Sequence, residues 1–267
     1  MKTLLGYSII VYLALTLALT FYASHYDDIP DFYLPQPAAV EFPPAPNFAK
    51  MENAQEKKQA FFDYFTPIVH QINANVSAER DVLLAIEDQY YADGTISEHG
   101  IEVIDTLSEE YGIELREDKI EQITALLKRV NIVPTSLALA QAANESGWGT
   151  SRFARKGNNY FGMWCYSKGC GYVPNARASG AKHEVRKFSS PAESVKAYVH
   201  NINTHRAYRL LRSIRQQAVN SGTPISGELL ADGLLNYSER REDYVAEIKG
   251  MIRSNELDSE RLILTTD

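Results

Sequence analysis

The sequence predicts a mainly α-helical (α+β) protein, in which a helical layer precedes a helical domain that carries a small β-hairpin lobe. Apolar side chains recur at three- and four-residue steps in residues 51–130 and again after residue 190, as in amphipathic helices. Residues 158–188 lack that period and are rich in glycine, aromatic and turn residues. We find no internal repeat, so the pattern indicates a mainly helical protein with a minor β element.

The N-terminal residues 1–24 are predicted to be a signal anchor. No charged residue interrupts residues 3–23, and about 20 such residues suffice to cross a membrane as a helix. Lys2 precedes this segment and two aspartates follow it, which places the bulk of the chain on the outer side. Signal-peptide cleavage needs small residues at both ends of an A-x-A-like site, but Phe21 stands at the first position. We therefore expect an inner-membrane anchor with the bulk of the chain on the outer, periplasmic side, and secretion after cleavage as the alternative.

Residues 25–50 are predicted to be a linker. Six of the eleven prolines lie between residues 29 and 47, and such a density favours an extended, semi-stiff chain. We expect this linker to hold the folded part of the protein away from the membrane.

Residues 51–128 are predicted to be a helical support region. Two apolar runs, one from Phe61 to Ile72 and one from Val82 to Tyr90, have helical spacing. A further helix should end near Gly112, and Asp118 with Glu121 forms a capping-box-like start for the next. These apolar faces indicate core contacts and not a functional site.

Residues 129–255 are predicted to form a second domain, followed by a tail at residues 256–267. Pro134 and Thr135 open a helix of small and aliphatic residues, which Gly147 and Gly149 stop. The sequence Ser190-Pro191, with a glutamate at position 193, starts another helix. Later helices are expected within residues 227–235 and 244–252.

Charge is distributed unevenly along the chain. The net charge is -7, yet residues 51–121 contain 17 acidic and 5 basic side chains, whereas residues 151–215 contain 13 basic and 2 acidic ones. A strongly positive segment either solvates the surface or binds an anionic polymer. Export favours an anionic glycan over nucleic acid as that polymer.

The two cysteines, Cys165 and Cys170, enclose the tetrapeptide Tyr-Ser-Lys-Gly. In an exported protein such a pair predicts a local disulfide that closes a short hairpin, with two free thiols as the alternative. No second pair of Cys or His residues has ligand spacing. The sequence therefore predicts no metal site and no other cofactor.

Glu145 is the candidate catalytic residue. It lies at the C-terminal end of the predicted buried helix, where the helix dipole and the neighbouring Trp148 would both raise its pKa. A glutamic acid protonated near neutral pH can donate a proton to the leaving oxygen of a glycosidic bond. Position alone favours an ordinary polar residue, but the aromatic residues that follow, of the kind that stack on sugars, favour the catalytic interpretation.

Four short motifs follow one another in this region. They are Ala143-Asn-Glu145-Ser-Gly-Trp-Gly149, Asn159-Tyr-Phe161-Gly162, Val185-Arg186-Lys-Phe188, and Tyr237 with Tyr244. In order and spacing they resemble the peptidoglycan β-N-acetylglucosaminidase domain of flagellar-type and autolysin-type cell-wall hydrolases, and within that family the group of proteins called Bax. The resemblance covers about residues 130–252 and, more weakly, the helices from residue 51 onward. The cysteine pair is also similar to that of the Bax group.

This resemblance implies a lysozyme-like fold and an endo-β-N-acetylglucosaminidase that cleaves the β-1,4 bond after N-acetylglucosamine in peptidoglycan glycan strands. Glu145 would be the general acid, and Tyr237 matches a family tyrosine near the reacting sugar. The residues that would bind substrate are Trp148, Asn159, Tyr160, Phe161, Gly162, Trp164, Arg186 and Tyr244.

A second catalytic carboxylate is not evident. Several family members have an acidic residue in the β lobe, but no Asp or Glu lies between Cys165 and His183 of this chain. Retaining and inverting glycosidases both normally use two carboxyl groups. Glu184 is one candidate for the second group, and assistance from the substrate's own N-acetyl group is the other. Two further functions stay open: a lytic transglycosylase, which leaves an anhydro product, and a non-catalytic wall-binding module.

Overall fold

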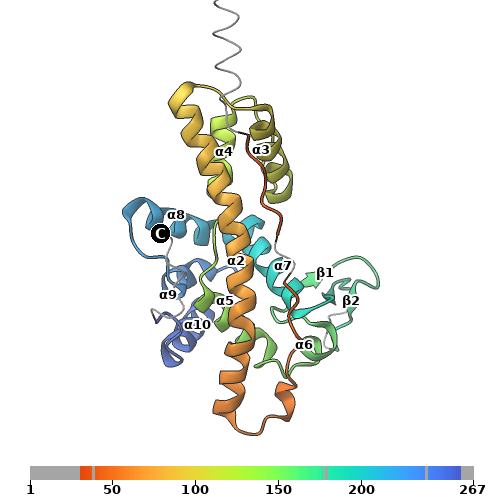
Figure 1. Cartoon of the computed structure of the whole chain (residues 1–267). Helices are drawn as coiled ribbons and strands as arrows, with labels where there is room; N and C mark the ends of the chain where they lie inside the picture. The colour runs from red at the N-terminus through yellow and green to blue at the C-terminus, as the bar shows by residue number, and fades with distance from the viewer. Residues whose placement is uncertain (1–30, 38–39, 176, 178–179, 238–239, 260–267) are drawn as a thin grey trace, which may run out of the picture.

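The computed structural model describes residues 31–37, 40–175, 177, 180–237 and 240–259 (Figure 1). The predicted anchor, residues 1–24, lies outside these residues. Within the described part of the chain, no helix is both long enough and apolar enough to cross a membrane. The mainly α fold class with a small β lobe is confirmed.

The longest element is the 40-residue helix α2, Ala54–Asp93, which stands upright through the middle of Figure 1. Asn53 caps it by accepting hydrogen bonds from the amides of Gln55 and Glu56, and Gly94 ends it in the left-handed conformation. Both apolar runs predicted for the support region lie on this one helix, because the polar residues between them contain neither glycine nor proline. Helices α3, Glu98–Tyr111, and α4, Lys119–Leu127, pack at its C-terminal end, with Asp118 as the predicted cap of α4.

The helix that carries the candidate acid, α5, is Thr135–Ser146. Residues 135–143 are all buried, and α5 contacts α2, α9 (Gly227–Ala231) and α10 (Glu242–Ser254). Its start is held firmly, because the Asn73 amide of α2 exchanges two hydrogen bonds with the main chain of Val133, at 2.7 and 3.1 Å. Gly147, at φ +56°, then ends the helix as predicted.

Three further α-helices belong to the described part of the chain. Helix α7, Pro191–Thr204, begins at the predicted Ser190 cap. Helices α6, Arg152–Gly157, and α8, Arg209–Ser221, were not predicted. The inward face of α8 includes the buried residues Arg212 and Arg215. Because these charged residues interrupt the apolar pattern, that pattern did not indicate a core-facing helix here. Three short 3-10 helices complete the set: η1 (Phe48–Lys50), η2 (Arg206–Tyr208) and η3 (Asp232–Leu234).

The β lobe is a three-stranded antiparallel sheet of β1 (Trp164–Cys165), β2 (Gly171–Tyr172) and β3 (Glu184–Arg186), in the order β1-β3-β2. The predicted disulfide between Cys165 and Cys170 is confirmed, with Cα atoms 6.2 Å apart. Contrary to expectation, the disulfide does not close a hairpin of its own, because β1 and β2 each pair with β3 and not with each other. Gly171 permits this close approach: a Cβ atom there would lie 2.0 Å from the Val185 carbonyl oxygen.

The described part of the predicted linker packs along the body of the protein and is not a free spacer. We call residues 31–37 and 40–50 the strap; it runs antiparallel to α2 in Figure 1. The Asp31 carboxylate lies 3.0 Å from the His99 ring nitrogen, and the Tyr64 hydroxyl donates to the Pro43 carbonyl at 2.7 Å. Phe48 is buried against Phe61, with ring centroids 5.3 Å apart. Prolines prevent regular secondary structure here, but the apolar residues between them still pack against the core.

The first residues of the predicted C-terminal tail also belong to the folded body. Leu257 is buried, and the Asp258 carboxylate accepts hydrogen bonds from the amides of Gly227 and Glu228, both at 2.9 Å. Asp258 thereby caps the start of α9.

Candidate active site

Glu145 lies in the last turn of α5, and its two carboxylate oxygens have different surroundings. The hydroxyl of Tyr244, on α10, donates a hydrogen bond to Glu145 Oε1 at 2.9 Å. On the other side, a Cβ atom added to Gly162 would lie 3.5 Å from Glu145 Oε2. One oxygen is therefore bound by a buried tyrosine, and the other faces the turn that contains Gly162.

The pKa of Glu145 is raised above its ordinary value. Partial burial is the largest cause, because it disfavours the charged carboxylate. The hydrogen bond from Tyr244 opposes this effect, while the negative charge of Glu247 reinforces it and the positive charge of Arg240 opposes it. The side chains of Arg240 and Glu247 form an ion pair. The direction of the shift agrees with the role of a general acid.

Three buried side chains form a hydrogen-bonded chain that ends on Glu145. The Tyr198 hydroxyl donates to Gln141 Oε1 at 2.7 Å, and Gln141 Nε2 donates to the Tyr244 hydroxyl at 2.9 Å. The Tyr244 hydrogen is then directed at Glu145 Oε1. Tyr244 is thus a buried positioning residue in this structure, not a surface for sugar contact.

The sequence did not single out Gln141 and Tyr198. One usable signal was present: Gln141 is the polar residue within the apolar run from Leu137 to Ala143, one turn before Glu145 and on the same face.

Tyr237 lies within the same site, as its place in the motif order suggests. Its hydroxyl donates to the Phe161 carbonyl oxygen at 2.9 Å, and its ring stacks on Tyr244 with centroids 5.1 Å apart. Burial and, next, the charge of Glu145 raise the pKa of Tyr237 well above its ordinary value. Tyr237 therefore stays neutral and ties the α10 side of the site to the turn at residues 159–163.

That turn is built from inside by three residues that were expected to bind substrate. The Asn159 amide donates to the carbonyls of Met163 and Arg186, at 2.9 and 2.8 Å. Phe161 stacks on Tyr198, with centroids 4.0 Å apart, and Tyr160 packs edge-on against Phe65. All three side chains are buried, so in this conformation they shape the turn and cannot stack on a sugar.

Two of the expected substrate residues are exposed on the β lobe. Trp164 is 56% exposed and stacks on His183, with ring centroids 4.0 Å apart. The Arg186 guanidinium is also at the surface, 4.8 Å from the centre of the Phe188 ring. Both side chains are available to a ligand.

Trp148 anchors the glutamate motif to the helical layer. Its ring lies edge-on to Phe62 and Phe61, at 5.4 and 5.8 Å, while its backbone is left-handed at φ +58°. Gly149 packs so tightly on Phe48 that a Cβ atom there would lie 2.4 Å from the Phe48 ring. Residues of the predicted support region and Phe48 of the strap therefore position the turn that follows Glu145.

The Glu184 carboxylate is engaged by the disulfide loop. One of its oxygens accepts the Gly169 amide at 3.0 Å and the other accepts the Gly171 amide at 2.8 Å. These two amides, that of Gly169 first, lower the pKa of Glu184. Among the described residues no hydrogen bond joins Glu184 to Glu145, and its visible role is to hold the loop against β3.

Within residues 31–259, apart from the gaps given above, no group of three or more His, Cys, Asp or Glu side chains is arranged to hold a metal ion. Two of the histidines in this part of the chain, His200 and His205, form hydrogen bonds within the protein. His200 Nε2 lies 2.9 Å from the Glu110 carbonyl oxygen, and His205 Nδ1 accepts the Ala207 amide at 3.3 Å.

Known proteins give a consistent comparison. The glucosaminidase family model, described as mannosyl-glycoprotein endo-beta-N-acetylglucosaminidase, matches residues 120–257, which include Glu145, Tyr237 and Tyr244. Protein bax of Escherichia coli (strain K12) is 34% identical over 213 residues, which cover 79% of this chain and 74% of that protein. No solved structure matches the chain at a significant level. The chain is therefore a Bax-like member of the glucosaminidase family.

Proposed function

We propose that this protein is a peptidoglycan hydrolase, an endo-β-N-acetylglucosaminidase that cleaves the β-1,4 bond after N-acetylglucosamine with Glu145 as general acid. The observation that carries the proposal is the Glu145 carboxyl group itself. Its pKa is raised by burial, Tyr244 binds one of its oxygens, and the other oxygen faces the Gly162 turn.

The hydrogen-bonded chain favours one location for the acidic proton. Because Oε1 already accepts the Tyr244 hydrogen, the proton of neutral Glu145 belongs on Oε2. From there it passes to the glycosidic oxygen as the bond from that oxygen to C1 breaks. The carboxylate that remains keeps its hydrogen bond from Tyr244, which stabilises the negative charge.

The substrate's own N-acetyl group supplies the nucleophile. Its carbonyl oxygen bonds to C1 as the leaving oxygen departs, giving a positively charged ring beside the Glu145 carboxylate. Water then adds to C1, the ring opens, and the water proton returns to Glu145, which restores the acid. The engagement of both Glu184 oxygens by backbone amides supports this route over one in which Glu184 is the second carboxylate.

Mass spectrometry of digested sacculi tests the proposal, with wild type and Glu145→Gln side by side. The expected product of the wild type is a glycan fragment that ends in reducing N-acetylglucosamine, and Glu145→Gln should yield none. An anhydro-muramic end would instead identify a lytic transglycosylase. Binding to sacculi without any new ends, in both proteins, would identify a wall-binding module.

We also propose that the enzyme acts in the periplasm, anchored in the inner membrane by residues 1–24. The uncharged segment 3–23 and the Cys165 to Cys170 disulfide, typical of oxidising compartments, support this location. Cell fractionation should find the protein in the membrane. A soluble form that begins near residue 24 would show that the segment is cleaved.

A further inference from the structure

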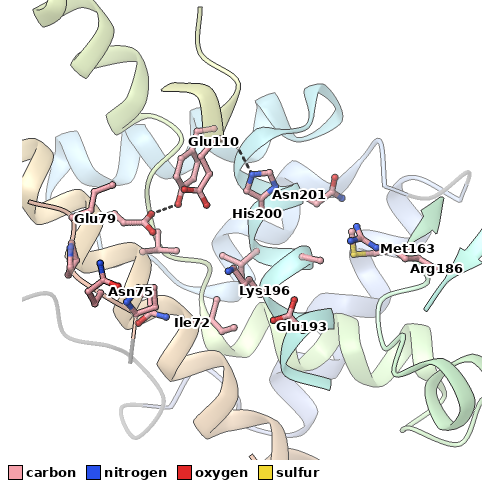
Figure 2. A pocket seen from close by; sticks show the side chains of 18 of the residues that line it. Ile72, Asn75, Glu79, Glu110, Met163, Arg186, Glu193, Lys196, His200 and Asn201 are labelled. Carbon is pink, nitrogen blue, oxygen red and sulfur yellow. Dashed lines mark hydrogen bonds between the residues drawn. The ribbon is translucent and has the colours of Figure 1, made fainter. Parts of the chain in front are cut away.

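A cavity of about 690 Å³ lies between the helical layer, α7 and the β lobe (Figure 2). Its walls come from α2, the C-terminal end of α3, α7, residues 34–37 of the strap, and the β lobe. The volume lies within the range of sites that hold small ligands. The described structure shows no role for this cavity in the chemistry at Glu145.

One wall of the cavity follows directly on the turn that faces the acid. A Cβ atom added to Gly162 would lie 3.5 Å from Glu145 Oε2, and the two residues that follow Gly162, Met163 and Trp164, line the cavity. Arg186 lines it at the same end, where its amide donates to the Met163 carbonyl at 2.9 Å. In Figure 2, Met163 and Arg186 lie on one side of the cavity, and Glu79 and Glu110 lie on the other. A ligand in this cavity could therefore be continuous with a substrate bound at Glu145.

Charges of both signs line the walls. Lys196 and Glu193 project from α7, Arg186 lies on β3, and Glu110 lies at the end of α3. Among the described residues, no ion pair engages any of these four side chains. Charged groups that face a cavity and form no ion pair within the described protein suit a ligand that carries both carboxylates and an amino group.

The acidic end has one preorganised group. The Glu79 carboxylate accepts the hydroxyl hydrogen of buried Tyr111 at 2.6 Å, which fixes its position. Burial raises the pKa of Glu79, as does the neighbouring charge of Glu110, while Lys196 and His200 act in the opposite direction. Glu79 and Glu110 thus form a place for an ammonium group, whereas Lys196 and Arg186 offer places for carboxylates.

We propose that this cavity binds the peptide that branches from the glycan strand of peptidoglycan, with its carboxylates at Lys196 and Arg186 and its amino group at Glu79 and Glu110. The proposal rests on the function proposed above, since it assigns a second part of the same substrate. A glycan strand of neutral N-acetylated sugars without peptides offers no charged groups to pair with these five charged side chains. The peptide carries both kinds of charge and leaves the strand close to the bond that is cut.

The test compares two substrates and three proteins. Glycan strands are prepared from sacculi with their peptides intact, and a second batch is stripped of peptides with an amidase. The full-length chain in detergent is assayed as wild type, as the double variant Lys196→Gln/Glu110→Gln, and as Lys128→Gln, which removes an exposed lysine that does not line the cavity. We expect the double variant to raise KM for peptide-bearing strands roughly fivefold more than for stripped strands, as the loss of two exposed charge contacts would do. Lys128→Gln should show no such difference.

Equal KM values of wild type for both substrates would overturn the proposal. An equal rise of KM for both substrates in the double variant would also overturn it, because it would mean that the cavity binds glycan. If wild type cleaves neither substrate, the proposed function fails, and calorimetric titration decides the cavity on its own. In that titration the amidase-released peptide is added to the Glu145→Gln chain, with and without Lys196→Gln/Glu110→Gln. Binding that the double variant weakens supports the cavity as a peptide site, and absence of binding to Glu145→Gln refutes it.

Discussion

Replacing Tyr244 by Phe isolates the influence of a single hydrogen bond on the candidate acid. The substitution keeps the ring that stacks on Tyr237 and removes only the hydroxyl that lies 2.9 Å from Glu145 Oε1. A hydrogen bond to a charged group contributes about 1.5–3 kcal/mol, and one pKa unit corresponds to about 1.4 kcal/mol. Because the bond favours the carboxylate, its loss should raise the pKa of Glu145 by about one to two units.

The assay is the pH dependence of kcat/KM for glycan strands. A general acid must be protonated, so activity falls as pH rises through its pKa, and Tyr244→Phe should move this basic limb to higher pH by about one to two units. The maximal rate should fall, because the carboxylate loses its orienting partner. Tyr237→Phe is the matched control, since it removes a hydroxyl that binds the Phe161 carbonyl and should leave the limb in place. A limb that stays fixed or moves to lower pH in Tyr244→Phe would refute this account of the site.

Three further predictions concern Glu184, Glu145 and Arg215. Glu184→Gln should keep the rate of sacculus hydrolysis within roughly tenfold of wild type. Removal of a catalytic acid or base lowers the rate by about 10²–10⁴-fold. A decrease in rate of that size in Glu184→Gln would identify Glu184 as the second carboxylate. Glu145→Gln should raise the thermal unfolding midpoint at pH 7 but not at pH 3. A raised pKa in the folded state lowers stability only as pH rises above the unfolded pKa of about 4.3. A gain of equal size at both pH values would contradict the raised pKa. Arg215→Met should lower the free energy of unfolding, measured by urea titration, by roughly 3–5 kcal/mol. The buried Arg215 guanidinium donates hydrogen bonds to the carbonyls of Asn131 and Ile132 and to the Asn203 side chain, and these acceptors would lose their donor. A change below about 1 kcal/mol would show that water replaces the guanidinium.

Local signals in the sequence predicted the parts of the fold that depend on local chemistry. Asp118 and Ser190 begin helices because their side chains bind the first free amides, and Gly112 and Gly147 end helices because they adopt left-handed backbones. The disulfide joins cysteines only five residues apart. Each of these features is decided within a few residues along the chain.

The features that were missed depend on distant partners. The two-residue strands β1 and β2 have no periodicity to detect, and their order around β3 depends on Gly171 and on the Glu184 carboxylate. The hydrogen-bonded chain behind Glu145 joins Gln141 to Tyr198 and Tyr244, which are 57 and 103 residues away. Such polar contacts leave no pattern within one short segment.

The catalytic motif cannot be treated as independent of the N-terminal layer. The turn after Glu145 rests on Phe48 through Gly149 and on Phe61 and Phe62 through Trp148, and Tyr160 in the next motif packs on Phe65. These three phenylalanines of α2 come from residues that the family model does not match, yet they cover the core side of both motifs. A chain cut at residue 129 would expose the buried face of α5 and these aromatic contacts to water. The packing around the turn after Glu145 therefore includes Phe48 of the strap and the phenylalanines of α2, in addition to residues within the matched range 120–257.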